Sequence, residues 1–347
     1  MERNLEAAID VVEAAYDLEI GAAEWLPNLI AAGEPLFDMG MGCFGTIAAG
    51  RSVGGVPLLT QIEASRGAEE LPTRIIEATM EAGPEPVVKA SRAVQGKMHL
   101  LSDLPDLWGD SYEAIKRRVG CQDILSMTAV DPDGHGVHIG IPSKSALSLD
   151  RRQREYWQML HVHLATGHRL RRGLGQEGDA TGVPLTDIPL AGEALIDPTR
   201  FMVAHATGEA QHRGAANAMR EAARMLDKAR GPLRRKDPNE ALRLWKGLVL
   251  GKWTLVDWFD SDGRRFVLAK QNAPRIKDPR GLTEREAQVA TYASLGETSK
   301  IIGYRLGLSA SYVSRLLQTS MRKLGVKTQA QLVEKMRWVQ SAGQPTA

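Results

Sequence analysis

Two capping boxes frame the C-terminal part of the chain and restrict it to short helices. Thr283 is followed three positions later by Glu286, a spacing that lets each side chain satisfy an exposed amide at a helix start. This helix begins at about residue 284, and Gly296 ends it. Thr328 and Gln331 repeat the pattern and begin another helix, which reaches about residue 339.

Between these two helices, the sequence predicts a helical pair separated only by a tight turn. The first covers 299–306 and is stopped by Gly307, and Ser309 caps the second, which runs to about Leu324 before Gly325. Its inward positions are Val313, Leu316, Leu317, Met321 and Leu324, and its outward positions are Ser311, Ser314, Arg315, Gln318 and Arg322. A helix-turn-helix that places this polar face in the major groove has this plan. A structural four-helix unit with a solvated face fits the periodicity equally well.

The distribution of charge favours a polyanionic partner for this part of the chain. Residues 276–347 carry eleven Lys and Arg against five Asp and Glu, a balance of +6, whereas the rest of the chain has a balance of −4. Arginine can make paired hydrogen bonds to guanine, and glutamine can do the same to adenine, so Arg315 and Gln318 suit base recognition.

Residues 282–333 also resemble the LuxR-type (GerE-type) helix-turn-helix of bacterial transcription regulators. The resemblance rests on Leu282, Thr283, Arg285, Glu286, Val289, Gly296, Lys300, Ile302, Arg305, Leu306, Gly307, Ser309, Val313, Arg322, Lys323, Leu324, Gly325 and Val326. It implies an all-α four-helix DNA-binding domain whose third helix reads bases and whose fourth helix mediates dimerisation. By position, the implied base contacts are Ser314, Arg315 and Gln318. The implied DNA backbone contacts are Lys300, Ser311, Tyr312, Arg322, Lys323 and Lys327.

The third helix departs from that family at several positions. The family usually has a small hydroxyl residue where Tyr312 stands, a basic residue at Ser314, a histidine at Leu316 and an apolar residue at Ser320. Ser320 is expected to bond back to its own helix, which is less stabilising than a packed aliphatic side chain. These differences leave the DNA target open.

Ile301 and Tyr304 form a second kind of departure, because the family usually has polar residues there. Their spacing of three places them side by side on one helix. We interpret them as a docking patch for another domain or subunit, with ordinary scattered apolar exposure as the alternative.

The rest of the chain predicts two α+β regions of sensor type. Residues 1–173 resemble a GAF-type domain in element order: a surface helix with one buried stripe at 5–20, two strands near 43–65, a hairpin turning at 131–134, and a long helix at 150–172. Residues 174–188, rich in Gly, Pro and Asp, are the expected linker. Residues 189–272 resemble a reduced PAS-type domain, with helices near 210–230 and 239–250 and a hairpin turning at 261–263. A second linker, 273–281, then precedes the DNA-binding domain at 282–340.

Other function classes receive little support from the sequence. Cys43 and Cys121 have no metal or disulfide spacing and are expected to be reduced. His161, His163 and His168 point to different faces or lie too far apart on one helix, and His135 and His138 point oppositely on strands, so no metal site is expected. We expect no catalysis and no cofactor. No apolar run approaches the ~18 residues of a membrane span, and no signal peptide is present, so a cytoplasmic location is expected.

The combined interpretation is a cytoplasmic bacterial transcription regulator. Two sensor-like domains would control a C-terminal helix-turn-helix that binds double-stranded DNA as a homodimer. An unidentified small-molecule effector and RNA polymerase are further candidate partners. The alternative is a protein-interaction regulator whose helix-turn-helix is degenerate and no longer reads DNA.

Overall fold

The computed structural model describes residues 6–53, 56–131, 134–181, 193–259, 263–272 and 281–342. The chain divides into two compact units, Met1–Ile188 with Lys228–Leu242, and Pro189–Asp227 with Arg243–Ala347. The multidomain α+β plan followed by an all-helical C-terminal domain is confirmed. The boundaries of the three domains proposed from the sequence stay a prediction. Segment 228–242 packs with the first unit, although it lies inside the region expected to be PAS-like.

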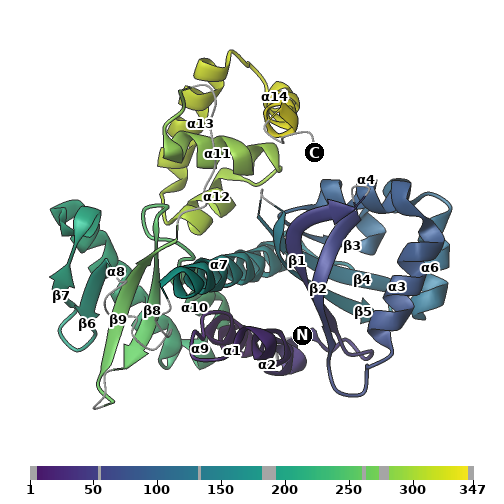
Figure 1. Ribbon diagram of the computed structural model, residues 1–347, viewed down its shortest axis with the longest axis horizontal. Helices are drawn as coiled ribbons and strands as arrows, with labels where there is room; N and C mark the ends of the chain where they lie inside the picture. Colours follow the sequence, from purple (N-terminus) through teal and green to yellow (C-terminus); the bar gives the residue numbers. More distant parts are fainter. Residues whose placement is uncertain are drawn as a thin grey trace. The chain divides into compact units, whose positions relative to one another are not determined.

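A five-stranded antiparallel sheet forms the centre of the first unit (Figure 1). Its strand order is β2-β1-β5-β4-β3, so strands adjacent in sequence pair as hairpins at β1–β2 and β4–β5. The strands are β1 (Phe44–Val53), β2 (Val56–Ala64), β3 (Lys97–Leu100), β4 (Asp123–Val130) and β5 (His135–Ser143). Both hairpins agree with the sequence prediction, whereas the short edge strand β3 was not predicted.

The described residues between 6 and 181 also form seven α-helices. They are α1 (Ala7–Ala15), α2 (Ala22–Phe37), α3 (Leu71–Ala82), α4 (Pro84–Val94), α5 (Pro105–Trp108), α6 (Ser111–Val119) and α7 (Arg151–Thr181). The β4–β5 hairpin supplies the core that α7 covers, because alternate side chains such as Met127 and Ile139 point to one face and are fully buried. The helices α4 and α5 were not predicted.

The first helix is more buried than its sequence pattern suggests. It was expected to bury one stripe, but Ala7, Ala8, Ile9, Val11, Val12, Ala14 and Ala15 are all buried. The reason lies in two distant segments. Arg230 Nε donates to Glu13 Oε1 at 2.9 Å, and Arg234 pairs with Asp10, so segment 228–242 forms ion pairs with the acidic side that was expected to face only water. On another side, a Cβ atom at Gly167 of α7 would lie 2.3 Å from the Ala15 carbonyl oxygen, so α1 and α7 approach closely.

The long helix α7 also exceeds its predicted end. It continues from Arg151 to Thr181 and so extends into the segment expected as a linker. The glycines of this stretch predicted the end of the helix, but intrinsic helix propensity is only a weak guide to where a helix ends, and they do not stop it.

A four-stranded antiparallel sheet organises the second unit, in the order β7-β6-β9-β8 (Figure 1). Its strands are β6 (Ala194–Asp197), β7 (Met202–Ala206), β8 (Trp253–Phe259) and β9 (Arg265–Gln271). The helices between β7 and β8 along the chain are α8 (Arg213–Arg230), α9 (Leu233–Lys236) and α10 (Pro238–Leu244). The helix predicted over 239–250 therefore ends at Leu244. The two predicted hairpins are present, although their turn residues 132–133 and 261–262 lie outside the described residues.

A buried ion pair in the first unit yields a stability prediction. Arg169 Nε and Nη2 each donate to the Asp131 carboxylate at 2.6 Å, with both side chains almost completely buried. Arg169→Met leaves a buried carboxylate without its cation and should lower the unfolding free energy by about 3 to 5 kcal/mol. The measurement is urea denaturation followed by tryptophan fluorescence.

The matched control is Arg151→Met, on the same helix. Arg151 pairs with Glu155 at 3.4 Å, but its side chain is 91% exposed, so the loss should stay under about 1 kcal/mol. Equal losses in the two variants would contradict the importance of the buried pair.

Candidate nucleic-acid interface

Four helices form the C-terminal domain, and each follows its sequence prediction closely. They are α11 (Glu284–Ser294), α12 (Ser299–Leu306), α13 (Ala310–Leu324) and α14 (Gln329–Ala342). The bounds of α12 agree with the predicted ones, and α14 continues slightly beyond residue 339. The turn between α12 and α13 is tight, as expected of a helix-turn-helix.

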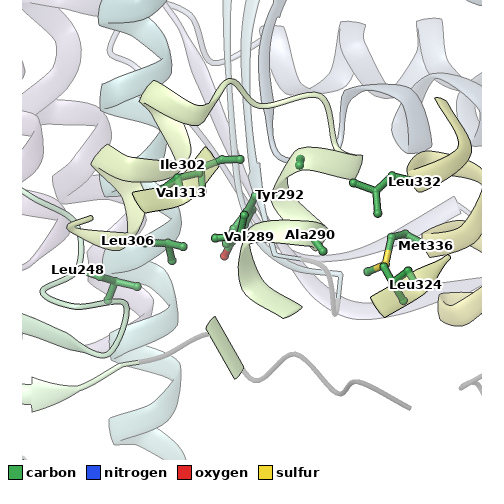
Figure 2. Packing of buried hydrophobic residues seen from close by; sticks show 11 residues of the cluster. Leu248, Val289, Ala290, Tyr292, Ile302, Leu306, Val313, Leu324, Leu332 and Met336 are labelled. Carbon is green, nitrogen blue, oxygen red and sulfur yellow. The ribbon is translucent and has the colours of Figure 1, made fainter. Parts of the chain in front are cut away.

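The helices pack around a small apolar core (Figure 2). Its fully or almost fully buried members on the four helices are Val289, Ala290, Tyr292, Ala293, Ile302, Leu306, Val313, Leu324, Leu332 and Met336. Leu316, Leu317 and Met321 of α13 pack against them. One further member, Leu248, comes from outside the four helices and was not anticipated from the sequence.

The predicted caps are present at the helix ends. Thr283 Oγ1 accepts from the Glu286 amide at 3.3 Å, and Glu286 Oε2 accepts from the Thr283 amide at 2.7 Å. Ser309 Oγ accepts from the Tyr312 amide at 3.2 Å, which fixes the start of α13. Thr298 caps α12 in the same way through the Ile301 amide at 3.3 Å, a contact that was not predicted although a threonine just before a helix is a common cap.

The outward side of α13 carries the three predicted base readers. Arg315 and Gln318 are exposed, and Ser314 is half-buried with its hydroxyl 3.4 Å from Ser299 Oγ. The Arg315 guanidinium lies 5.0 Å from the centroid of the Tyr312 ring, close enough for a cation–π interaction. An arginine on the outer face of the second helix of the pair, supported by an aromatic ring from the same helix, is suited to reach a base edge.

Comparison with known protein families identifies the helical domain. Residues 280–336 match the family described as bacterial regulatory proteins, luxR family. This segment is a LuxR-family helix-turn-helix domain. The match spans all of α11, α12 and α13 and most of α14. A comparison of the chain with curated proteins finds no match.

The candidate backbone contacts of the LuxR-family domain differ in their availability. Lys300, Ser311, Arg322 and Lys327 are exposed, and Tyr312 is half-buried beneath Arg315. Lys323 is also exposed, but its ammonium is paired within the domain. Its ammonium donates to Glu286 Oε2 at 2.7 Å and lies 3.4 Å from the Gly281 carbonyl oxygen. Lys323 therefore joins α13 to the start of α11, a role that the sequence did not reveal.

Ser320 occupies a position where the family usually has an apolar residue, and the structure shows how it is accommodated. The side chain is fully buried, and its hydroxyl lies 2.8 Å from the Leu316 carbonyl oxygen of its own helix, as predicted. The same hydroxyl lies 3.1 Å from the Glu286 carbonyl oxygen of α11. Two acceptors are thus available to one donor, and the buried hydroxyl carries no unsatisfied hydrogen.

A buried ion pair supports α12 from within the LuxR-family domain. Arg305 Nε donates to Glu297 Oε2 at 3.1 Å, and the two side chains are each about 2% exposed. The guanidinium also lies 4.5 Å from the centroid of the Tyr292 ring. Arg305 belongs to the sequence signature, and the structure shows that it serves the fold of the domain and does not face outward.

The docking interpretation of Tyr304 is supported within the second unit. Ile301 and Tyr304 are each 6% exposed, and the ammonium of Lys246 lies 5.0 Å from the centroid of the Tyr304 ring. Lys246 follows α10 and lies outside the LuxR-family match. The Tyr304 ring is therefore in contact with a part of the chain outside the LuxR-family match.

Two of the histidines considered as metal ligands lie at hydrogen-bond distance from other residues of the first unit. His161 Nε2 donates to the Thr128 carbonyl at 3.0 Å, and His163 Nδ1 lies 2.9 Å from the Tyr16 hydroxyl. Among the described residues, no three His, Cys, Asp or Glu side chains are grouped so that they could hold a metal ion. A search of the same residues finds no helix with the length and apolar character needed to span a bilayer.

The Glu286–Lys323 pair predicts a pH dependence. The hydrogen bond from Lys323 is the main cause that lowers the pKa of Glu286 below its ordinary value. Because the pKa is lower in the folded domain than in the unfolded chain, the stabilisation is present above about pH 4.3 and is lost as the pH falls through the folded value. Lys323→Gln should therefore cost up to about 1 kcal/mol of stability at neutral pH and progressively less in acid.

The measurement is thermal unfolding of the variant and the unaltered protein from pH 3 to 7. Lys327→Gln is the control. Lys327 is an exposed lysine shortly after α13, and its substitution removes the same charge. A loss that is constant across this pH range would show that Glu286 is not responsible for it.

Proposed function

We propose that the LuxR-family domain binds duplex DNA by placing the outer face of α13 in the major groove. The observation that carries this proposal is the exposure of Arg315 and Gln318 on that face, with Arg315 supported by the Tyr312 ring. Arg315 would donate two hydrogen bonds to a guanine, Gln318 would contact an adenine, and Ser314 would contact a neighbouring base edge.

Phosphate contacts on both sides of the groove would set the register of the domain. Lys300 at the start of α12 and Ser311 at the start of α13 would meet the backbone close to helix N-termini, which also attract anions. Arg322 and Lys327 would meet it near the other end of α13, and Tyr312 would contribute its hydroxyl. Lys323 stays a candidate, but a phosphate would compete there with Glu286.

The remainder of the chain is proposed to regulate this activity. Each of the two units combines an antiparallel sheet with helices, and GAF-like and PAS-like assignments would give them roles in binding a small-molecule effector and in dimerisation. A homodimer would present two copies of α13 to a two-fold symmetric DNA site. Bacterial origin, a cytoplasmic location and contact with RNA polymerase belong to the same proposal.

A second candidate function is a protein-interaction regulator with a degenerate helix-turn-helix. One observation favours it: Ser314 stands where the family usually has a basic residue, and its hydroxyl is directed to Ser299. This function predicts that the helical domain has no preferred DNA sequence.

Selection from random duplexes with the intact protein separates the two functions. DNA reading predicts an enriched motif and an affinity that falls as salt is raised, because bound phosphates release counterions. If no motif is enriched and binding does not depend on salt, the degenerate alternative holds.

Two single substitutions should separate base reading from backbone contact. Arg315→Ala should cost about 1 to 3 kcal/mol of specific binding and relax the preference at one base pair. Lys327→Ala should weaken binding to all sequences alike and reduce the slope of log affinity against log salt by about 1. The measurement is fluorescence anisotropy on the selected duplex and on a scrambled duplex, at several salt concentrations. Equal losses on both duplexes for Arg315→Ala would remove its role as a base reader.

A further inference from the structure

A tight turn between α10 and β8 has an unusual backbone conformation. The Lys252 amide donates to the Val249 carbonyl at 3.1 Å and closes the turn around Leu250 and Gly251. Both central residues have positive φ, 53° at Leu250 and 72° at Gly251. Positive φ at two consecutive positions is typical of a type I′ turn, and it is strained for a leucine.

This turn is fixed firmly to the second sheet. The Val249 amide donates to the Trp253 carbonyl at 2.6 Å, and the Trp253 amide returns a bond to Val249 at 3.1 Å. The Asn272 amide, at the end of β9, donates to the Lys252 carbonyl at 2.6 Å. The turn therefore moves with β8 and β9.

The tip of the same turn bonds to the LuxR-family domain on two helices. The Gly251 amide donates to the carbonyl of Leu306, the last residue of α12, at 2.5 Å. The Gly251 carbonyl accepts from Gln288 Nε2 of α11 at 3.1 Å, and Gln288 is 1% exposed. A carbonyl at a helix end lacks an intrahelical partner, so the turn supplies the partner that α12 needs.

Apolar packing and close backbone approach accompany these bonds. Leu248 is fully buried in the core of the LuxR-family domain, near Leu306 (Figure 2). A Cβ atom at Gly307 would lie 2.0 Å from the Leu248 carbonyl oxygen, so only glycine permits this approach. The Lys246 ammonium over the Tyr304 ring adds a third point of contact.

We propose that residues 246–252 are an internal docking surface for the α11–α12 end of the LuxR-family domain, so that this domain and the second sheet form one rigid body. The segment that docks on this surface belongs to the same chain and contains Gln288, Tyr304, Leu306 and Gly307. The docked face lies on α11 and α12 and leaves Arg315 and Gln318 of α13 exposed. A change in the β8–β9 sheet then moves α12 directly, without passing through residues 273–280.

Hydrogen exchange at the Gly251 amide tests this docking in the intact chain. In the docked state this amide is bonded to Leu306, and within its own turn it is not the amide that closes the turn. We expect it to be protected, and Gln288→Ala, a substitution in α11, should accelerate its exchange about five-fold through loss of the second bond at the same residue.

Gln329→Ala is the matched control for this experiment. Gln329 Nε2 also donates to a backbone carbonyl at 3.1 Å, but that carbonyl belongs to Ala293 within the helical domain. Exchange of α13 amides in both variants reports any general loosening of the domain, and the Gly251 rate is compared with it. Unprotected Gly251 in the unaltered protein, or equal effects of the two variants on Gly251, would overturn the proposal. Neither result depends on DNA binding, so the proposed function is tested separately.

Discussion

Glu286 connects the start of α11 to α13, and the orientation of α13 within the helical domain depends on this connection. Its carboxylate accepts from the Thr283 amide and from the Lys323 ammonium, and its backbone carbonyl lies 3.1 Å from the Ser320 hydroxyl. A carboxylate at a helix start is favoured by the exposed amides there, and the lysine offsets the cost of burying it. Ser320 and Lys323 lie three residues apart on one side of α13, so Arg315 and Gln318 face the other way.

The departures of α13 from its family are matched by local contacts. Ser320 replaces an apolar residue and gains acceptors on two helices, and Tyr312 replaces a small residue and supports the Arg315 guanidinium. Both contacts are compatible with the proposed DNA reading, in which Ser314 would give a preferred sequence different from that of relatives with a basic residue there.

The sequence predicted the parts of this structure that depend on neighbouring residues. Capping boxes, glycine stops and the inward stripe of α13 act within a few positions, and they placed α11 to α14 almost residue by residue. Contacts between distant segments were missed for the opposite reason. The acidic side of α1 looked solvated because its partners Arg230 and Arg234 are more than two hundred positions away. Lys323 looked like a free phosphate ligand because nothing in the local pattern points to Glu286.

The core of the LuxR-family domain extends beyond the segment that identifies the family. The match begins at residue 280, yet Leu248 is a fully buried member of the core and Gly251 bonds to the end of α12. A domain of about sixty residues is only marginally stable alone, and loss of one buried leucine from a core costs about 2 to 5 kcal/mol. The boundary of the family is therefore not the boundary of the folding unit. The proposed recognition of DNA by α13 would then be coupled to the second sheet through the contacts that Leu248 and Gly251 make with the helical domain.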